Sequence, residues 1–118
     1  MGLSQEKPAI SFEDFQKVAM RVGQITQVED FPEARQPAYK VWVDFGPYGV
    51  KKSSAQLPEW YPDPDGLLGR RVVAVTNFPP KQIGPMTSEV LILGAVQSDG
   101  RVVLLQPDDE SELGAPVA

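Results

Sequence analysis

Apolar and polar residues alternate in several short runs of this chain, and a period of two residues is typical of β-strands. In the clearest run, residues 39–45, Val41, Val43 and Phe45 would share one face, and Trp42 would lie on the other. Turn residues follow at 46–49, so residues 50–54 are predicted to return as the second strand of a hairpin. Apolar and β-branched runs at 71–76, 89–96 and 101–105 predict three later strands.

An alternating pattern over residues 18–28 predicts the first strand, and its phase changes at Gly23. A phase change at glycine is typical of a β-bulge, which helps a strand to curve into a small closed barrel. Ahead of this strand, residues 11–17 predict a short helix with Ser11 as its N-cap. Residues 55–68 are rich in proline and predict turns, with one short helix that begins near Pro58.

The pattern of short strands predicts an all-β protein with one domain over residues 1–118, namely a small five-stranded β-barrel of the OB type with short flanking helices. A β-sandwich is the alternative. A short extension at 1–11 would precede the barrel, and an acidic tail at 108–118 would follow it, either partly ordered or free. The late strands carry apolar residues at both parities, so we expect a helix, the tail or a partner subunit to cover their second face.

Between two predicted strands, residues 77–89 form a loop that contains three prolines and one glycine. Proline restricts φ, so the loop would present its side chains with little further loss of entropy on binding. The candidate contact residues in it are Phe78, Lys81, Ile83, Met86, Ser88 and Glu89. Core packing is the simpler explanation for Phe78, whereas Met86 is expected to be exposed. For Glu89, capping of the following strand competes with ligand binding.

The chain contains no cysteine and no histidine, which excludes disulfides, thiolate and imidazole metal ligands, and the usual Cys and His catalytic groups. We therefore expect no enzyme, no metal and no other cofactor. An enzyme that uses Asp44 or Glu89 as an acid or base stays an alternative, and it would need a deep cleft. Ser53 and Ser54 follow two lysines, but neighbouring strand residues point to opposite faces and so do not indicate a nucleophile pair.

The net charge of −5 is unevenly distributed, with −3 over residues 1–33, +3 over 34–81 and −5 over 82–118. This balance argues against a protein that depends on neutralising phosphates, although the basic middle segment could attract an anion or an acidic segment. Five basic residues are candidates for the rim of a groove: Arg35, Lys40, Lys51, Lys52 and Lys81. Their alternative role is solubility and the protection of strand edges.

Three aromatic residues, Trp42, Trp60 and Tyr61, would either provide a binding surface or pack against the barrel. The N-terminal residues lack the apolar core of a signal peptide, and no apolar run reaches the length of a membrane span. We therefore expect a soluble, cytoplasmic protein.

Several segments together resemble the tRNA-binding OB-fold domains of bacterial tRNA-binding proteins and of some aminoacyl-tRNA synthetases. They are residues 20–25, 31–34, 43–46, 52–56 and 77–93. Within that superfamily, Ser53-Ser54-Ala55-Gln56 and Asn77-Phe78-Pro79-Pro80 are most similar to the CsaA family of secretion chaperones. The tRNA-binding relatives usually carry Ser-Gly-Leu where Ser54-Ala55-Gln56 stands, and more basic charge near the loop.

The resemblance implies a homodimeric, non-enzymatic chaperone that binds unfolded or export-destined preproteins and assists Sec-dependent secretion together with components of the Sec translocation machinery. A tRNA-binding module acting in trans is the alternative. The expected groove for a peptide or tRNA contains nine residues: Trp42, Lys52, Ser54, Gln56, Phe78, Lys81, Met86, Ser88 and Glu89.

Overall fold

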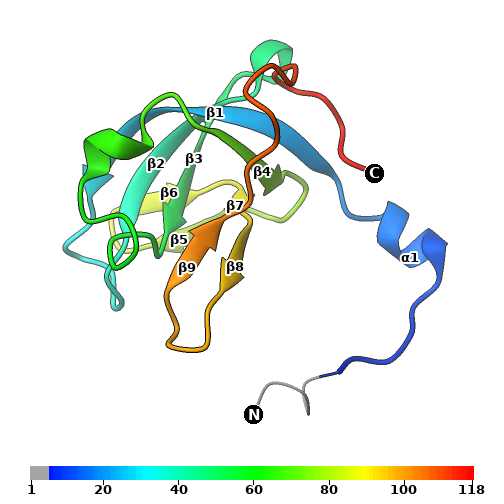
Figure 1. Ribbon diagram of the computed structural model, residues 1–118, viewed down its shortest axis with the longest axis horizontal. Helices are drawn as coiled ribbons and strands as arrows, with labels where there is room; N and C mark the ends of the chain where they lie inside the picture. The colour runs from blue at the N-terminus through cyan, green and yellow to red at the C-terminus, as the bar shows by residue number, and fades with distance from the viewer. Residues whose placement is uncertain (1–5) are drawn as a thin grey trace.

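Five antiparallel strands coil into a nearly closed barrel in the order β3-β2-β1-β4-β7, which confirms the predicted all-β OB-type fold (Figure 1). The computed structural model describes residues 6–118. The helical elements are α1 (Phe12–Gln16), η2 (Gly46–Tyr48) and η3 (Pro64–Leu67). The strands are β1 (Met20–Asp30), β2 (Tyr39–Asp44), β3 (Val50–Ala55), β4 (Arg71–Val75), β5 (Lys81–Ile83), β6 (Met86–Ser88), β7 (Leu91–Ile92), β8 (Gly94–Val96) and β9 (Val102–Leu104).

The core lies inside the barrel and uses the face that the alternation in β2 predicts. Val41, Val43 and Phe45 are buried there, together with Ile25 of β1 and Val72 of β4. Every second residue of a strand points to the same side, so a locally visible pattern is enough to place these side chains. Among residues 6–118, no helix is both long and apolar enough to cross a membrane.

The bulge in β1 lies further along the strand than predicted. The register between β1 and β2 shifts between Ile25 and Gln27, whereas the pairing of β1 with β4 runs regularly through Gly23. Gly23 has another reason to be glycine. A Cβ atom there would collide with Cγ1 of Val43 and lie 2.9 Å from Cε1 of Phe45. The glycine therefore leaves room over β1 for the core side chains of Val43, on the neighbouring strand β2, and Phe45, directly after it.

The helical predictions are confirmed at one end of the chain and wrong in the middle. The helix α1 begins where expected, and the Ser11 side chain accepts a hydrogen bond from the Asp14 N–H. In the proline-rich connection, the short helix opens at Pro64 instead of near Pro58, and Asp63 caps it by accepting from the Asp65 N–H. Asp at the N-cap followed by Pro at N1 favours the start of a helix, and Asp63 and Pro64 provide this pair here.

The predicted loop at 77–89 contains a hairpin of its own, in which β5 and β6 pair between Lys81 and Ser88. The predicted strand at 89–96 is likewise split into β7, which pairs with β4, and β8, which pairs with β9. This division leaves some apolar side chains of the late strands exposed, Val96 at 73% and Leu91 at 47%.

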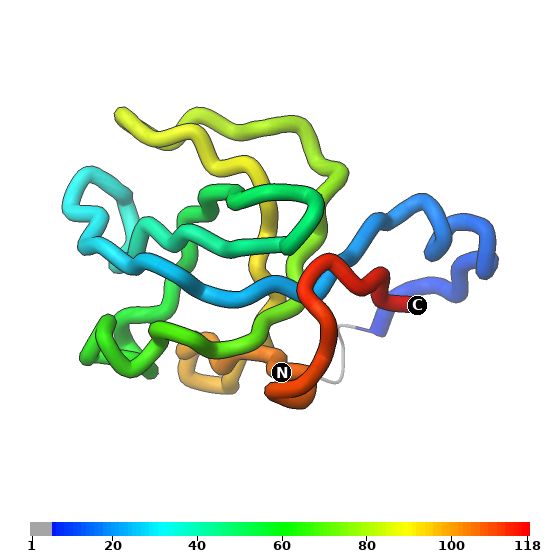
Figure 2. The backbone as a smooth tube through the Cα atoms, turned by 90° about the horizontal axis from the view of Figure 1, so that it is seen from above, coloured from blue at the N-terminus to red at the C-terminus, as the bar shows by residue number. Residues whose placement is uncertain are grey.

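The C-terminal tail is ordered along the first half of β1. The Val22 N–H donates to the Ala115 carbonyl, and the N–H groups of Gly114 and Val117 donate to carbonyls of Val22 and Met20. Seen from above, the tail crosses the barrel and ends near the segment that leads from α1 (Figure 2). The tail therefore covers an edge of β1 that β4 and β2 leave open.

Candidate functional site

A groove runs past the β5–β6 hairpin over the end of β3, and we call it the hairpin groove. It consists of two hollows, of about 590 Å³ and about 410 Å³. Both are lined by Ser54, Gln56, Lys81 and Ile83, so they form one continuous depression. Strand β3 supplies the floor through Ser54, because alternate residues of that strand face outward while Ser53 and Ala55 face the core.

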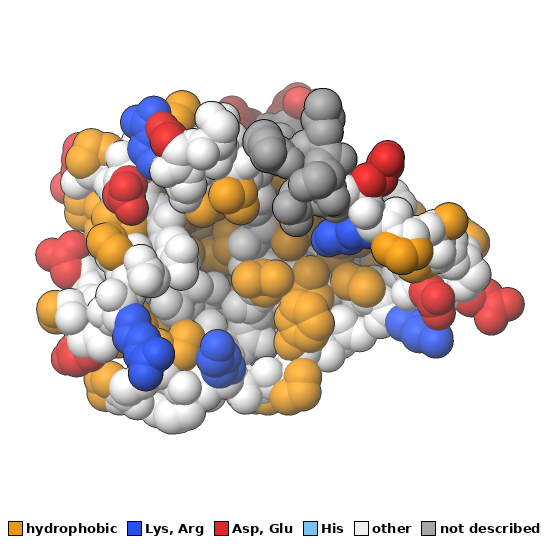
Figure 3. Space-filling model, turned by 90° about the horizontal axis from the view of Figure 1, so that it is seen from below, with side chains coloured by type: hydrophobic (Ala, Val, Ile, Leu, Met, Phe, Trp, Pro, Cys, Tyr) orange, Lys and Arg blue, Asp and Glu red, His pale blue; other side chains and the backbone are white. Residues whose placement is uncertain are grey.

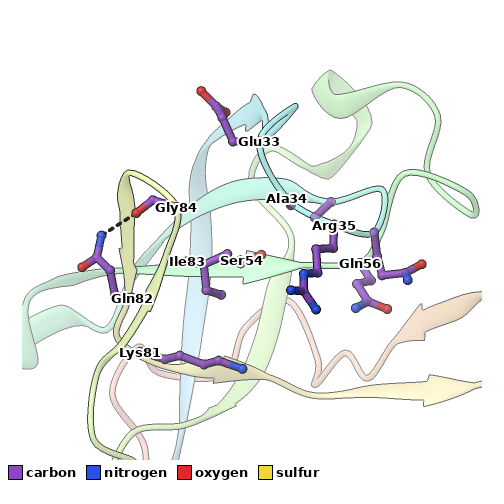
Figure 4. A pocket seen from close by; sticks show the side chains of 11 residues that line it. Glu33, Ala34, Arg35, Ser54, Gln56, Lys81, Gln82, Ile83 and Gly84 are labelled. Carbon is purple, nitrogen blue, oxygen red and sulfur yellow. Dashed lines mark hydrogen bonds between the residues drawn. The ribbon is translucent and has the colours of Figure 1, made fainter.

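The first hollow lies between the hairpin and the loop of residues 33–38. Figure 4 shows Arg35 on the loop and Lys81 on β5 extending into the space over Ser54 and Gln56. The hairpin beside this space is held by its own hydrogen bonds. Gln82 donates to the Gly84 carbonyl at 2.8 Å and accepts from the Thr87 hydroxyl at 2.8 Å.

The hairpin is docked on the loop through Met86, which is 4% exposed and packs with Phe31 and Ala38. The expectation that Met86 would be exposed is wrong. In a two-stranded hairpin alternate residues face opposite sides, and the side that carries Met86 and Ile83 meets the apolar loop. Met86 therefore supports the groove from beneath and does not line it.

The side chain of Phe78 is 52% exposed, so the expectation that it packs in the core is wrong. It follows β4 at the mouth of the barrel and lines the second hollow together with Pro79 and Leu91. This end of the groove is consequently apolar, and an aromatic and an aliphatic side chain are both available for contact.

Ser88 and Glu89 close the barrel along the edge of β3. The Ser88 hydroxyl accepts a hydrogen bond from the Ser54 N–H at 3.1 Å, and Glu89 Oε1 accepts one from the Lys52 N–H at 3.0 Å. The Glu89 N–H donates in turn to the Lys52 carbonyl at 2.8 Å. These side chains thus satisfy backbone groups that a neighbouring strand would otherwise pair. Both also line the second hollow.

Six of the nine expected groove residues come together around the hairpin groove: Ser54, Gln56, Phe78, Lys81, Ser88 and Glu89. Of the remaining three, Met86 is buried beneath the hairpin, and Trp42 and Lys52 lie outside the groove. Trp42 and Lys52 are cross-strand partners on β2 and β3, both half-buried, and neither lines the two hollows.

The sequence reasoning missed Pro79, Leu91 and the loop residues Glu33 and Ala34 as lining residues. The signal for the loop was its position between two prolines, which stiffen it next to the hairpin. Leu91 could not be found in this way, because exposure of one face of β7 depends on how the barrel closes.

The charges that line the hairpin groove balance, since Arg35 and Lys81 are matched in number by Glu33 and Glu89. Within residues 6–118 the ion pairs are Lys17–Asp14 and Arg101–Asp99, both on the exposed surface and away from the groove. Of the other basic candidates, Lys51 lines a separate hollow, and Lys40 lies 5.3 Å from the ring of Phe31. Such a groove offers polar contacts without the excess of positive charge that polyphosphate ligands need.

The aromatic residues of the 55–68 connection anchor it to the barrel. The Tyr61 hydroxyl accepts from the Leu104 N–H at 3.0 Å, and the Tyr39 hydroxyl donates to the Tyr61 carbonyl at 2.8 Å. Trp60 is 40% exposed, and the guanidinium of Arg101 lies 4.7 Å from its ring. Burial raises the pKa of the Tyr39 phenol, and the nearby carboxylates of Asp30 and Asp63 raise it further.

The acid/base candidates are both engaged by the backbone. Asp44 Oδ1 accepts from the Gly46 N–H at 2.8 Å in the turn after β2, and Glu89 accepts from Lys52 as described. In the part of the chain that the structure describes, no three His, Cys, Asp or Glu side chains gather in an arrangement that could hold a metal ion.

Comparison with known proteins gives one family and a consistent set of relatives. Residues 20–116 match the family model described as a putative tRNA binding domain. The chain is 39% identical over 113 residues to a methionine--tRNA ligase of Pyrococcus furiosus and 42% identical over 108 residues to that of Pyrococcus abyssi. These alignments cover 96% and 92% of this chain but 15% and 14% of the ligases, so it spans a small part of the length of those curated relatives.

Solved structures match over nearly the whole chain. The chaperone CsaA of Bacillus anthracis is 46% identical with a TM-score of 0.88, and the alignment covers 94% of this chain and 100% of that one. The CsaA chaperone protein of Picrophilus torridus is 48% identical with a TM-score of 0.86, with 93% and 100% covered. A MetRS related protein of Pyrococcus horikoshii is 26% identical with a TM-score of 0.84, with 95% and 100% covered.

Proposed function

We propose that this chain, which belongs to the family of putative tRNA binding domains, is a non-enzymatic chaperone that binds extended, partly apolar peptide segments. The proposal rests on the hairpin groove, which is apolar at one end and balanced in charge. The observation that carries this proposal is the exposed side chain of Phe78 beside Pro79 and Leu91 in the groove. Exposed aromatic and aliphatic side chains at a groove favour contacts with apolar segments.

The similarity to CsaA chaperones along almost the full length of both chains supports the same proposal. As part of it, the clients are unfolded or export-destined preproteins, the site of action is the cytoplasm, and the protein assists Sec-dependent secretion together with components of the Sec translocation machinery. Each groove would bind weakly, since it is shallow and a single extended segment buries little surface, so two grooves on one particle would strengthen binding through effective concentration.

A homodimer is therefore also part of the proposal, and the N-terminal segment supports it. The helix α1 buries none of its residues on its own chain and projects from the barrel in Figure 1, with Ile10 at 69% and Phe12 at 70% exposure. Apolar side chains also gather between the barrel and this projecting segment in Figure 3. Apolar surface of this kind is typical of a subunit contact. Analytical ultracentrifugation should show a dimer at micromolar concentration, and a monomer alone would contradict it.

The alternative, tRNA binding in trans, is favoured by the family match and by the methionine--tRNA ligase relatives. Binding to tRNA depends on phosphate neutralisation and falls steeply with salt, whereas capture of an apolar peptide is nearly independent of salt. Titration of the protein with tRNA and with an unfolded preprotein at two salt concentrations separates the two functions. Preprotein binding and suppressed aggregation at both concentrations, with negligible tRNA binding at the higher one, supports the chaperone. The reverse result supports the tRNA module.

A further inference from the structure

A third hollow, of about 440 Å³, opens at the end of the barrel beside Arg21, which donates to the Gly114 carbonyl of the C-terminal tail, and we call it the tail pocket. Its wall combines two cations, Arg21 and Lys51, with the rings of Tyr48 and Phe78 and with the carboxylate of Glu89. None of its cations belongs to the hairpin groove described above. This mixture of positive charge and flat apolar surface suits a ligand that carries an anionic group next to an apolar one.

Arg21 is held in place before any ligand arrives. Its Nη1 donates to the Gly114 carbonyl at 2.8 Å, and its guanidinium carbon lies 3.8 Å from the centre of the Tyr48 ring. The tail pairs with β1 on either side of Arg21, since the Val22 N–H donates to the Ala115 carbonyl and the Val117 N–H donates to the Met20 carbonyl. A fixed guanidinium loses little entropy on binding an anion, and its other N–H groups can donate to a carboxylate.

The local charge of the tail pocket is positive. Arg21 and Lys51 outnumber Glu89, whose Oε1 already accepts from the Lys52 N–H. Among residues 6–118 the ion pairs lie elsewhere, so neither cation is matched with an acidic side chain. Two cations beside one carboxylate, on a protein of net charge −5, suit a single anionic group better than a chain of phosphates.

The tail pocket continues the hairpin groove, because Phe78, Glu89 and Val90 line both. An extended segment that lies with apolar side chains against Phe78 would reach the tail pocket with its flanking residues. We propose that the tail pocket binds the carboxylate of an Asp or Glu residue that flanks the apolar segment of an extended client. This inference rests on the proposed peptide-binding function and adds a preference for acidic flanks.

The test uses two synthetic peptides with blocked ends and the same apolar centre, one flanked on both sides by Glu and the other by Gln. Flanks on both sides remove any dependence on binding direction. Both are titrated by fluorescence anisotropy at low salt against the full chain, the Lys51→Gln variant and the Lys17→Gln variant. Lys17 is a matched control, because it is the C-cap of α1, outside both the groove and the tail pocket, and its replacement changes the net charge equally.

We expect the unaltered protein to bind the Glu-flanked peptide about fivefold more tightly, which corresponds to a partly exposed charge pair. Lys51→Gln should reduce this preference to about twofold or less without changing affinity for the Gln-flanked peptide, and Lys17→Gln should retain it. Thermal melting monitored by circular dichroism checks that both variants fold. Arg21→Lys, which keeps the charge but loses the planar contact with Tyr48, should show an intermediate preference.

Two results would overturn the inference while the proposed function stands: equal affinity for the two peptides, or a preference that survives in Lys51→Gln. If neither peptide binds the unaltered protein, the peptide-binding function itself fails. A third experiment titrates an RNA oligonucleotide against the same proteins. The pocket would be assigned to nucleic acid instead if the RNA binds the unaltered protein, competes with the Glu-flanked peptide, and loses more affinity in Lys51→Gln than the peptide does.

Discussion

Replacement of Glu89 with alanine tests whether this residue is first of all part of the fold. The change removes the acceptor of the Lys52 N–H, a hydrogen bond of 3.0 Å at the edge of β3. A hydrogen bond to a charged partner contributes about 1.5–3 kcal/mol, and the half-buried position of Glu89 places the expected loss near the lower end, about 1.5 kcal/mol. For a domain of this size that loss corresponds to a melting temperature lower by about 5–8 °C.

The companion variants separate the hydrogen bond from the charge. Glu89→Gln keeps an oxygen that can accept the same bond, so its free energy of unfolding should stay within about 0.5 kcal/mol of the unaltered protein. Ser88→Ala removes the neutral acceptor of the Ser54 N–H at 3.1 Å and should lower that free energy by about 1 kcal/mol.

Urea unfolding followed by circular dichroism measures these differences, with the protein concentration held constant because a dimer would make stability concentration-dependent. If the free energy of unfolding of Glu89→Ala stays within about 0.5 kcal/mol of that of the unaltered protein, the range of ordinary surface substitutions, the hydrogen bond from Lys52 to Glu89 does not stabilise the fold. If Glu89→Gln is as stable as the unaltered protein and yet binds peptide or tRNA more weakly, the charge of Glu89 serves the ligand as well.

Three further outcomes are expected. Gly23→Ala should lower the free energy of unfolding by about 2 kcal/mol, because its Cβ collides with Val43 in the core, whereas Gly66→Ala, with nothing within 4 Å, should leave it nearly unchanged; equal urea midpoints would contradict this. The raised pKa of Tyr39 means that its contribution to stability is complete below about pH 10 and is lost as the pH rises through the folded-state pKa, so Tyr39→Phe should show a smaller loss of unfolding free energy between about pH 9 and pH 11. Phe78→Ala should weaken binding of an apolar peptide about tenfold while changing stability by less than about 0.5 kcal/mol; a large loss of stability would show that the ring supports the fold.

Features that depend on neighbouring residues could be predicted from the sequence alone. The period of two in residues 39–45 placed Val41 and Val43 in the core, and Ser11 marked the start of α1. The number of short strands favoured an OB-type barrel, with a β-sandwich as the alternative, and the barrel is confirmed. Side-chain alternation and capping act within a few residues of the chain, so a linear pattern records them.

Which side chains of the 77–89 segment face the hairpin groove depends on tertiary packing. Met86 is buried because the hairpin docks on Phe31 and Ala38, and Phe78 is exposed because it leaves the barrel at the end of β4. Ser88 and Glu89 lie opposite β3, more than 30 residues away in the chain, and no local pattern indicates that their side chains satisfy its backbone. Such contacts depend on how distant segments close the barrel, and for that reason the groove could be named from the sequence but its residues could not all be placed.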